Sequence, residues 1–179
     1  MAFNHPVDDL HTEHLRIAIA EAQKAIPTPT AFCVGCALVV NLLVDGFAPV
    51  VLATGYSREL PGNTHAEANA LFKAKSLSSD QLASLFPPNM PRDDMMAHID
   101  VYTTLEPCSV RTSGLAPCTD ALIAFKVKRC FIGAGEPDDF VKCEGARKLQ
   151  DAGIEVIWLK GSEAECLAIA RRGHEPKDD

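Results

Sequence analysis

The sequence predicts an α/β fold in which helices form a sandwich around one sheet. Segments with helical spacing alternate along the chain with short apolar, β-branched segments that are typical of strands. The chain has 179 residues, which suffice for one domain and are too few for two ordinary ones. We therefore expect a single domain over residues 1–179, with a core from about 8 to 172 and a loose tail over 173–179.

The first part of the chain predicts one helix and two strands. Apolar residues at helical spacing over Asp8–Ile26 predict a helix, and the prolines that follow end it. Small, apolar and β-branched residues over Phe32–Val44 predict a strand that turns at Asp45-Gly46. Val50–Ser57 is the expected partner strand.

The middle part predicts a helix, an irregular segment and a third strand. The helix begins near Thr64 and places small apolar residues on one face. Residues Ser76–His98 are polar and rich in proline, so we interpret them as an excursion from the core. The third strand is expected over Ile99–Thr104.

The last part continues this alternation and completes five strands. After a loop rich in proline and cysteine, the expected elements are a helix over Cys118–Phe125, a strand over Arg129–Ala134, a helix over Lys142–Ala152, a strand over Ile154–Leu159 and a closing helix over Ser162–Arg171.

Charge and hydropathy limit the class of partner. A formal net charge of −7 argues against a broad nucleic-acid surface, which needs a basic field. No apolar stretch approaches the ~20 residues of a membrane span, and the N-terminus lacks the layout of a signal peptide. We therefore expect a cytoplasmic protein with no nucleic-acid or membrane partner. In that reducing compartment the seven cysteines indicate metal ligands, reactive thiols or core residues, not disulfides.

The segment Thr64-His65-Ala66-Glu67 has two interpretations. It can be a capping box, in which Thr64 caps the helix and Glu67 reaches back to it. It can also be a metal-binding histidine followed by a glutamate that does not bind the metal, the first half of a zinc deaminase signature. Downstream, Cys108 and Cys118 each follow a proline, and helix starts favour thiolates. The alternative for these two cysteines is a buried structural role.

Together these residues predict a zinc site with a general base. His65, Cys108 and Cys118 supply three ligands of the types that zinc binds, and a catalytic site leaves the fourth position to water. Because two thiolates cancel the charge of the ion, the water needs a nearby base. Glu67 is the candidate that takes its proton and returns protons to the ring nitrogen and the departing amine.

These motifs identify a family. His65-Ala66-Glu67, followed by Thr104-Leu105-Glu106-Pro107-Cys108, resembles the cytidine deaminase-like superfamily. Base deaminases usually carry Pro-Cys-x-x-Cys, whereas nine residues separate the two cysteines here. That long loop, together with Gly133-Ala134-Gly135-Glu136-Pro137-Asp138, is similar to the riboflavin-biosynthesis pyrimidine deaminases. The similarity runs from about residue 11 to 160 with no reductase domain after it, as in the stand-alone fungal form.

The resemblance implies a fold, a reaction and an assembly. The fold is a three-layer α/β/α sandwich around a five-stranded mixed sheet. The reaction is zinc-dependent hydrolysis of the 2-amino group of 2,5-diamino-6-ribitylamino-4(3H)-pyrimidinone 5'-phosphate, with release of ammonia. The resemblance also implies a homodimer. The expected cofactor is Zn²⁺, and the expected partner is the small pyrimidine phosphate.

Residues beyond the zinc shell are candidates for substrate binding. The loop between the cysteines offers one fixed charge and two hydroxyls, which can cradle a phosphate or form a solvated turn. Bacterial members usually have Asn-Pro before the first strand and this chain does not, so Asn63 is the candidate replacement for that asparagine. The expected substrate-binding residues are Asn63, Glu106, Ser109, Arg111, Thr112 and Ser113, with Arg58 as a further candidate.

Two alternatives to this function stay open. One is a nucleoside or tRNA base deaminase, which the acidic charge and the long cysteine loop disfavour. The other is a zinc-stabilised scaffold without catalysis, against which Glu67 argues because a structural zinc needs no base. Of the other histidines, we expect His5, His11 and His14 at the surface, and His98, just before a strand, is a lesser candidate for reaching the site. Cys33 and Cys36 have the Cys-x-x-Cys spacing of redox motifs, but they lie in a buried-looking strand, so we expect the remaining cysteines in the core (Cys33, Cys36, Cys130, Cys143, Cys166).

Overall fold

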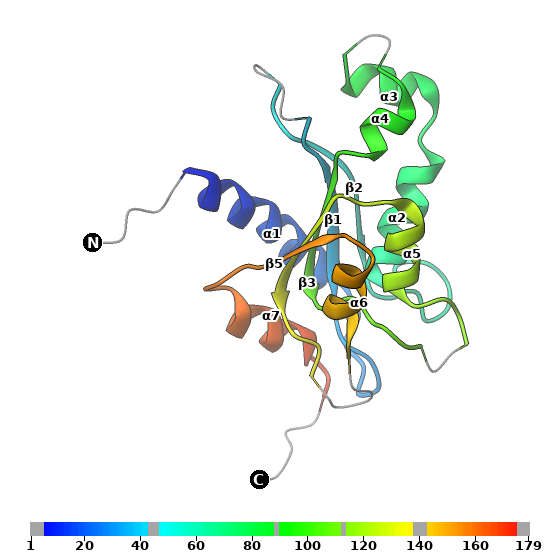
Figure 1. Cartoon of the computed structure of the whole chain (residues 1–179). Coiled ribbons are helices and arrows are strands. Elements are labelled where there is room, and N and C mark those ends of the chain that lie inside the picture. Colours follow the sequence, from blue (N-terminus) through cyan, green and yellow to red (C-terminus); the bar gives the residue numbers. More distant parts are fainter. Residues whose placement is uncertain (1–5, 43–46, 88–89, 112–113, 138–142, 175–179) are drawn as a thin grey trace.

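A five-stranded mixed sheet forms the centre of the protein (Figure 1). The computed structural model describes residues 6–42, 47–87, 90–111, 114–137 and 143–174. The strands are β1 (Gly35–Val40), β2 (Val50–Tyr56), β3 (Ile99–Leu105), β4 (Arg129–Ala134) and β5 (Glu155–Trp158). Their order across the sheet is β2-β1-β3-β4-β5. β1 runs antiparallel to both of its neighbours, whereas β3, β4 and β5 are parallel to one another.

Helices cover both faces of this sheet. They are α1 (Pro6–Lys24), α2 (Ala66–Ser76), α3 (Ser79–Leu85), α4 (Arg92–Met96), α5 (Cys118–Phe125), α6 (Gly145–Asp151) and α7 (Glu163–Ala170). α1 and α7 bury one apolar cluster against the sheet, and α2, α5 and α6 bury the other. The predicted three-layer sandwich around a five-stranded mixed sheet is confirmed. No helix in the described ranges is long and apolar enough to span a membrane.

Strand β1 brings the first helix close to the sheet. All six of its residues are buried, as expected for a central apolar strand. A Cβ added to Gly35 would lie 1.9 Å from the carbonyl oxygen of Ala18 in α1, so only glycine permits this approach. The predicted strand over Phe32–Val44 is shorter at both ends in the structure, where it spans Gly35–Val40, and the predicted turn at Asp45-Gly46 lies outside the described residues.

The segment over residues 76–98 differs from its prediction. It extends beyond the edge of the three layers, as Figure 1 shows, but it forms the helices α3 and α4. Leu82, Phe86 and Met95 are buried in the same apolar cluster as α2 and β1. The interpretation as an excursion from the core was wrong for these three residues, because their apolar side chains pack into the core cluster.

Two histidines and the start of the tail are also more buried than expected. His11 and His14 are buried on the side of α1 that faces the sheet, where they pack against aromatic rings. The centroids of the His11 and Phe131 rings lie 4.2 Å apart. The two histidines are not surface residues, since this face of α1 packs on β3 and β4. At the tail, the ring of His174 stacks on Phe32 at 5.2 Å, so residues 173–174 pack against the body of the protein.

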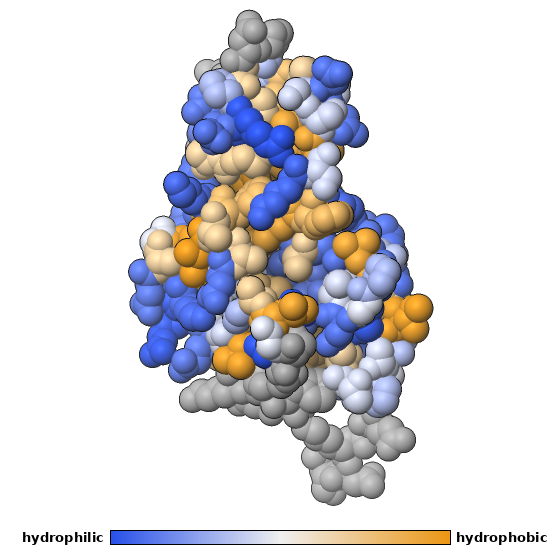
Figure 2. Space-filling model, turned by 90° about the vertical axis from the view of Figure 1, so that its right-hand side faces the viewer, coloured by the Kyte–Doolittle hydropathy of each residue, from blue (hydrophilic) through white to orange (hydrophobic). Residues whose placement is uncertain are grey.

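The face that carries α2 and α5 has an apolar centre. Figure 2 views this side of the molecule and shows hydrophobic residues gathered in its middle. Phe72 on α2 is 59% exposed, which is unusual for so large an apolar side chain.

Candidate active site

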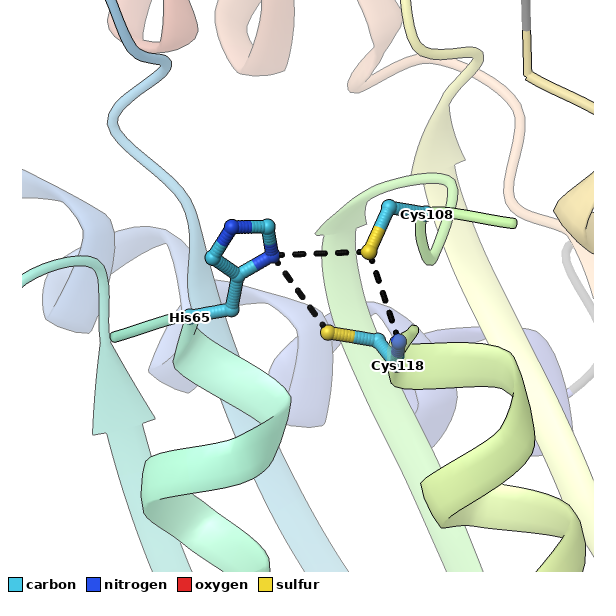
Figure 3. A group of neighbouring side chains, drawn as sticks. All are labelled: His65, Cys108 and Cys118. Carbon is cyan, nitrogen blue, oxygen red and sulfur yellow. Dashed lines mark hydrogen bonds between the residues drawn. The ribbon is translucent and has the colours of Figure 1, made fainter. Parts of the chain in front are cut away.

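Three predicted metal ligands meet where β3 ends and two helices begin. His65 directly precedes α2, Cys108 lies in the loop after β3, and Cys118 is the first residue of α5. Figure 3 shows their side chains pointing toward one another. The Nδ1 atom of His65 lies 3.5 Å from the sulfur of Cys108 and 3.5 Å from that of Cys118. The three donor atoms all lie within 4.8 Å of one another.

The backbone at the start of α5 stabilises the sulfur of Cys108. The backbone N–H of Cys118, at the open N-terminus of α5, donates to the sulfur of Cys108 at 3.3 Å. Hydrogen bonds with the Cys118 side chain and with His65 together lower the pKa of Cys108 to about 4, whereas the same hydrogen bond with Cys108 raises the pKa of Cys118. Cys108 is therefore poised as a thiolate, the form of cysteine that binds metals.

The cluster fits a zinc ion in donor type and in spacing. Zinc binds histidine nitrogen and thiolate sulfur tetrahedrally, which separates a nitrogen from a sulfur by about 3.5 Å. The distances from His65 to both cysteines match that separation. The cluster thus has the three protein ligands of a catalytic zinc site, which leaves a fourth position for water.

Glu67 lies beside this cluster and is almost fully buried. It is the second residue of α2 and only 3% exposed. The hydroxyl of Thr103 on β3 donates to its Oε1 at 3.2 Å. Burial raises the pKa of the Glu67 carboxyl, and the nearby Cys108 adds to the rise. A buried carboxyl with a raised pKa suits a group that takes up and releases protons.

The capping-box interpretation of this segment was wrong. The N-cap of α2 is His65, not Thr64, and its side chain makes no capping hydrogen bond. The Thr64 hydroxyl instead bonds the backbone of Leu60 and accepts from the Asn69 side chain. The Glu67 carboxyl instead contacts Thr103 on β3.

A cavity of about 400 Å³ opens beside the cluster. Its walls come from the segment before β1, the loop between β2 and α2, and the residues after β3 and β4. Glu67, His65 and Cys108 are among the residues that line it. The volume lies within the range of about 300–1,000 Å³ that is usual for small-molecule sites.

Two arginines line the cavity, and their guanidinium groups are positioned differently. Arg58 donates to the carbonyl oxygens of Ile26 at 2.7 Å and Phe32 at 3.1 Å, so it ties the pocket wall together. Arg111 donates from one nitrogen to the carbonyl oxygen of Asn63 at 2.7 Å. The Nε atoms of both arginines are buried and find no acceptor within the described ranges.

Only some of the other predicted substrate-binding residues line the cavity. Asn63 and Glu106 line the cavity, and Glu106 also accepts a hydrogen bond at 2.7 Å from the backbone of Ala146 in α6. The Ser109 hydroxyl accepts from the backbone N–H of Glu144 at 3.1 Å and is not among the lining residues. Thr112 and Ser113 lie outside the described residues.

Sequence reasoning missed two polar residues of the site. Glu136, just after β4, lines the cavity, and burial raises its pKa to about 7. Its Oε2 is buried and has no hydrogen-bond partner in the part of the chain that is described. The sequence signal that could have found Glu136 is its position directly after a strand parallel to β3, because the carboxyl ends of parallel strands lie at the same edge of the sheet. The second, Thr103, has no signal apart from its place on β3.

The remaining cysteines divide into two groups. Cys33, Cys36, Cys130 and Cys166 are buried in the core as predicted. Cys143 is only half-buried, and its thiol lies 3.5 Å from the carbonyl oxygen of Pro107, beside the active-site loop. The core prediction for Cys143 was wrong, because it lies in the connection before α6 and not within an element.

Comparison with known proteins gives a consistent result. A family model described as the cytidine and deoxycytidylate deaminase zinc-binding region matches residues 8–134. A Schizosaccharomyces pombe protein named diaminohydroxyphosphoribosylamino-pyrimidine deaminase is 42% identical over 167 residues, which are 93% of this chain and 36% of that protein. An Actinobacillus pleuropneumoniae riboflavin biosynthesis protein is 32% identical over 88% of this chain and 36% of its own length. The chain thus spans a little over a third of these two relatives.

A solved structure is similar over nearly its whole length. The crystal structure of the Aspergillus oryzae Rib2 deaminase in complex with DARIPP, a C-terminal deletion mutant, superposes with a TM-score of 0.74. The two chains are 33% identical, and the match covers 92% of each.

Proposed function

The chain belongs to the cytidine and deoxycytidylate deaminase family, and from this we propose that it hydrolyses the 2-amino group of a ribitylamino pyrimidinone phosphate in riboflavin biosynthesis. The observation that carries the proposal is a buried carboxylate, Glu67, beside a His-Cys-Cys cluster at the wall of a small cavity. The name of the S. pombe relative, a phosphoribosylamino-pyrimidine deaminase, supports a pyrimidine phosphate substrate, and the Aspergillus complex with DARIPP supports a small-molecule ligand.

We propose zinc as the metal held by His65, Cys108 and Cys118, because their donor types and spacing fit it. The chemistry that zinc supplies in such a site is an activated water near neutral pH. The backbone of α5 and the Cys108 thiolate hold the ligand set in place before substrate arrives.

Glu67 moves the protons of the reaction. Its carboxylate accepts a proton from the attacking water and passes it to the ring nitrogen. It then takes a second proton from the hydroxyl group newly added to the carbon and gives it to the departing amine, which leaves as ammonia. The carbon attacked is guanidine-like and becomes electrophilic once the ring nitrogen is protonated. Burial of Glu67 away from bulk solvent keeps the proton within the site.

The cavity also offers donors for a phosphate or a hydroxylated chain. Arg111 carries a fixed positive charge, and its buried Nε is available. Asn63 lies next to it, since its carbonyl oxygen accepts from Arg111. Charge-assisted bonds of this kind position an anionic substrate relative to the reacting carbon.

Arg111→Ala should mainly weaken capture of the phosphorylated substrate. Losing a charge-assisted bond raises KM by about tenfold or more, and the loss should be smaller for a dephosphorylated analogue. Steady-state kinetics on both compounds measure the difference, with Arg147→Ala on exposed α6 as the matched control. Equal losses on the two compounds would assign Arg111 a structural role.

The substrate is tested directly by following ammonia release. We expect the zinc-loaded protein to prefer the ribitylamino pyrimidine phosphate over the ribosylamino form by orders of magnitude, because a site that bonds extra hydroxyls rejects analogues lacking them. Cytidine and a tRNA anticodon stem-loop serve as controls. Preference for the ribosylamino form would refute the ribitylamino substrate but keep the pathway. Turnover of cytidine or tRNA alone would overturn the pathway.

The homodimer and the cytoplasmic location stay predictions. The apolar centre of the face in Figure 2 supports an association through that face.

A further inference from the structure

Thr103 is a buried hydroxyl that lies beneath the proposed base. It is on β3, opposite Cys36 of β1 in the sheet, and it is fully buried. Its Oγ1 lies 3.2 Å from Oε1 of Glu67, although 36 positions separate the two residues in the chain. The contact joins the central strand of the sheet to the first turn of α2.

The neighbouring threonine shows that this contact is specific to one face. Consecutive side chains of a strand point to opposite faces, so Thr104 points away from α2. Its hydroxyl accepts a hydrogen bond at 3.1 Å from the backbone N–H of Gly35. Thr104 is also fully buried, so the two threonines share residue type, strand and burial and differ in what they contact.

The Thr103 hydroxyl has a second hydrogen-bond partner in the backbone of its own strand. The carbonyl oxygen of Leu105 lies 2.9 Å from the same Oγ1. A hydroxyl has one proton to donate and lone pairs to accept with. The two contacts hold the hydroxyl between the Glu67 carboxyl and the backbone of β3.

The Thr103 hydroxyl remains able to donate a hydrogen bond to Glu67 when a metal is bound. The Cys118 side chain also influences the Glu67 carboxyl and lowers its pKa. As a zinc ligand, Cys118 is a thiolate and has no proton left to donate. Thr103 is not one of the three ligands, so its hydroxyl stays available to Glu67 when the metal site is filled.

We propose that Thr103 is a positioning residue that holds the Glu67 carboxyl beside the metal cluster by its hydrogen bond. The inference rests on the proposed deaminase function and adds a residue that acts through Glu67. Partners that orient the reactive groups of a metal site are typically worth about 10–100-fold in activity.

Three variants test the role. Thr103→Val keeps the shape and removes the hydroxyl, Thr103→Ser keeps the hydroxyl, and Thr104→Val removes an equally buried hydroxyl on the other face. We expect Thr103→Val to lower kcat by about 10–100-fold with KM and zinc content unchanged. Thr103→Ser should recover most of that loss, and Thr104→Val should keep kcat even where it lowers the melting temperature.

Each contrary outcome is informative. Equal kcat for Thr103→Val and Thr104→Val would overturn the positioning role, as would loss of zinc from Thr103→Val. Crystal structures of Thr103→Val and Thr103→Ser give a readout that needs no turnover: the Glu67 carboxyl should shift in the first and stay in the second. If the unmodified protein deaminated no pyrimidine, the proposed function would fail, and an unmoved Glu67 would refute the Thr103 contact separately.

Discussion

Glu67→Gln should lower kcat by about 10²–10⁴-fold while zinc content and melting temperature stay near those of the unmodified protein. Glutamine has the shape of glutamate and still offers Thr103 an acceptor oxygen, so the contact between α2 and β3 survives. It cannot take a proton from water, so the step that Glu67 is proposed to perform is lost.

The measurement is steady-state kinetics together with metal analysis and thermal unfolding. Glu59→Gln is the matched control, because Glu59 is a partly buried carboxylate outside the cavity lining that pairs with Lys73 at 2.6 Å. We expect Glu59→Gln to keep its turnover. Near-normal turnover by Glu67→Gln would count directly against proton transfer by this residue.

Cys118→Ala should abolish stable zinc binding and with it all activity. The change leaves two of the three protein ligands, and it also removes the sulfur at the start of α5. Cys108→Ala should do the same. We expect metal analysis of the purified proteins to fall from one zinc per chain to nearly none.

Cys166→Ala is the control for the loss of a buried thiol, because Cys166 lies in the apolar cluster on the opposite face of the sheet. It should keep its zinc. A chelator should lower the melting temperature of the unmodified protein and of Cys166→Ala, since the metal holds the β3 loop to the starts of two helices. Full zinc retention in both Cys108→Ala and Cys118→Ala would refute the ligand assignment.

Most elements could be predicted because their signals are local. Strands such as Arg129–Ala134 and the helix Cys118–Phe125 have the predicted bounds in the structure, since their apolar residues and flanking turns decide the conformation. Predictions failed where burial depends on distant partners. The histidines of α1 look polar in sequence, but aromatic rings from β3 and β4 cover them. Leu82, Phe86 and Met95 look like parts of a polar loop, but they complete a core cluster.

The candidate site divides in the same way. The residue types of His65, Glu67, Cys108 and Cys118, with their spacing, were readable from the sequence because zinc and proton transfer each accept few side chains. The sequence by itself thus determined the class of chemistry and the order of the elements that carry it. Only the tertiary structure decided that Glu67 turns toward Thr103 and that Glu136 and Arg58 line the same cavity. These residues come from separate strands and loops, and no local pattern states which of them share an edge of the sheet. Packing of α2 and the parallel strands brings them together.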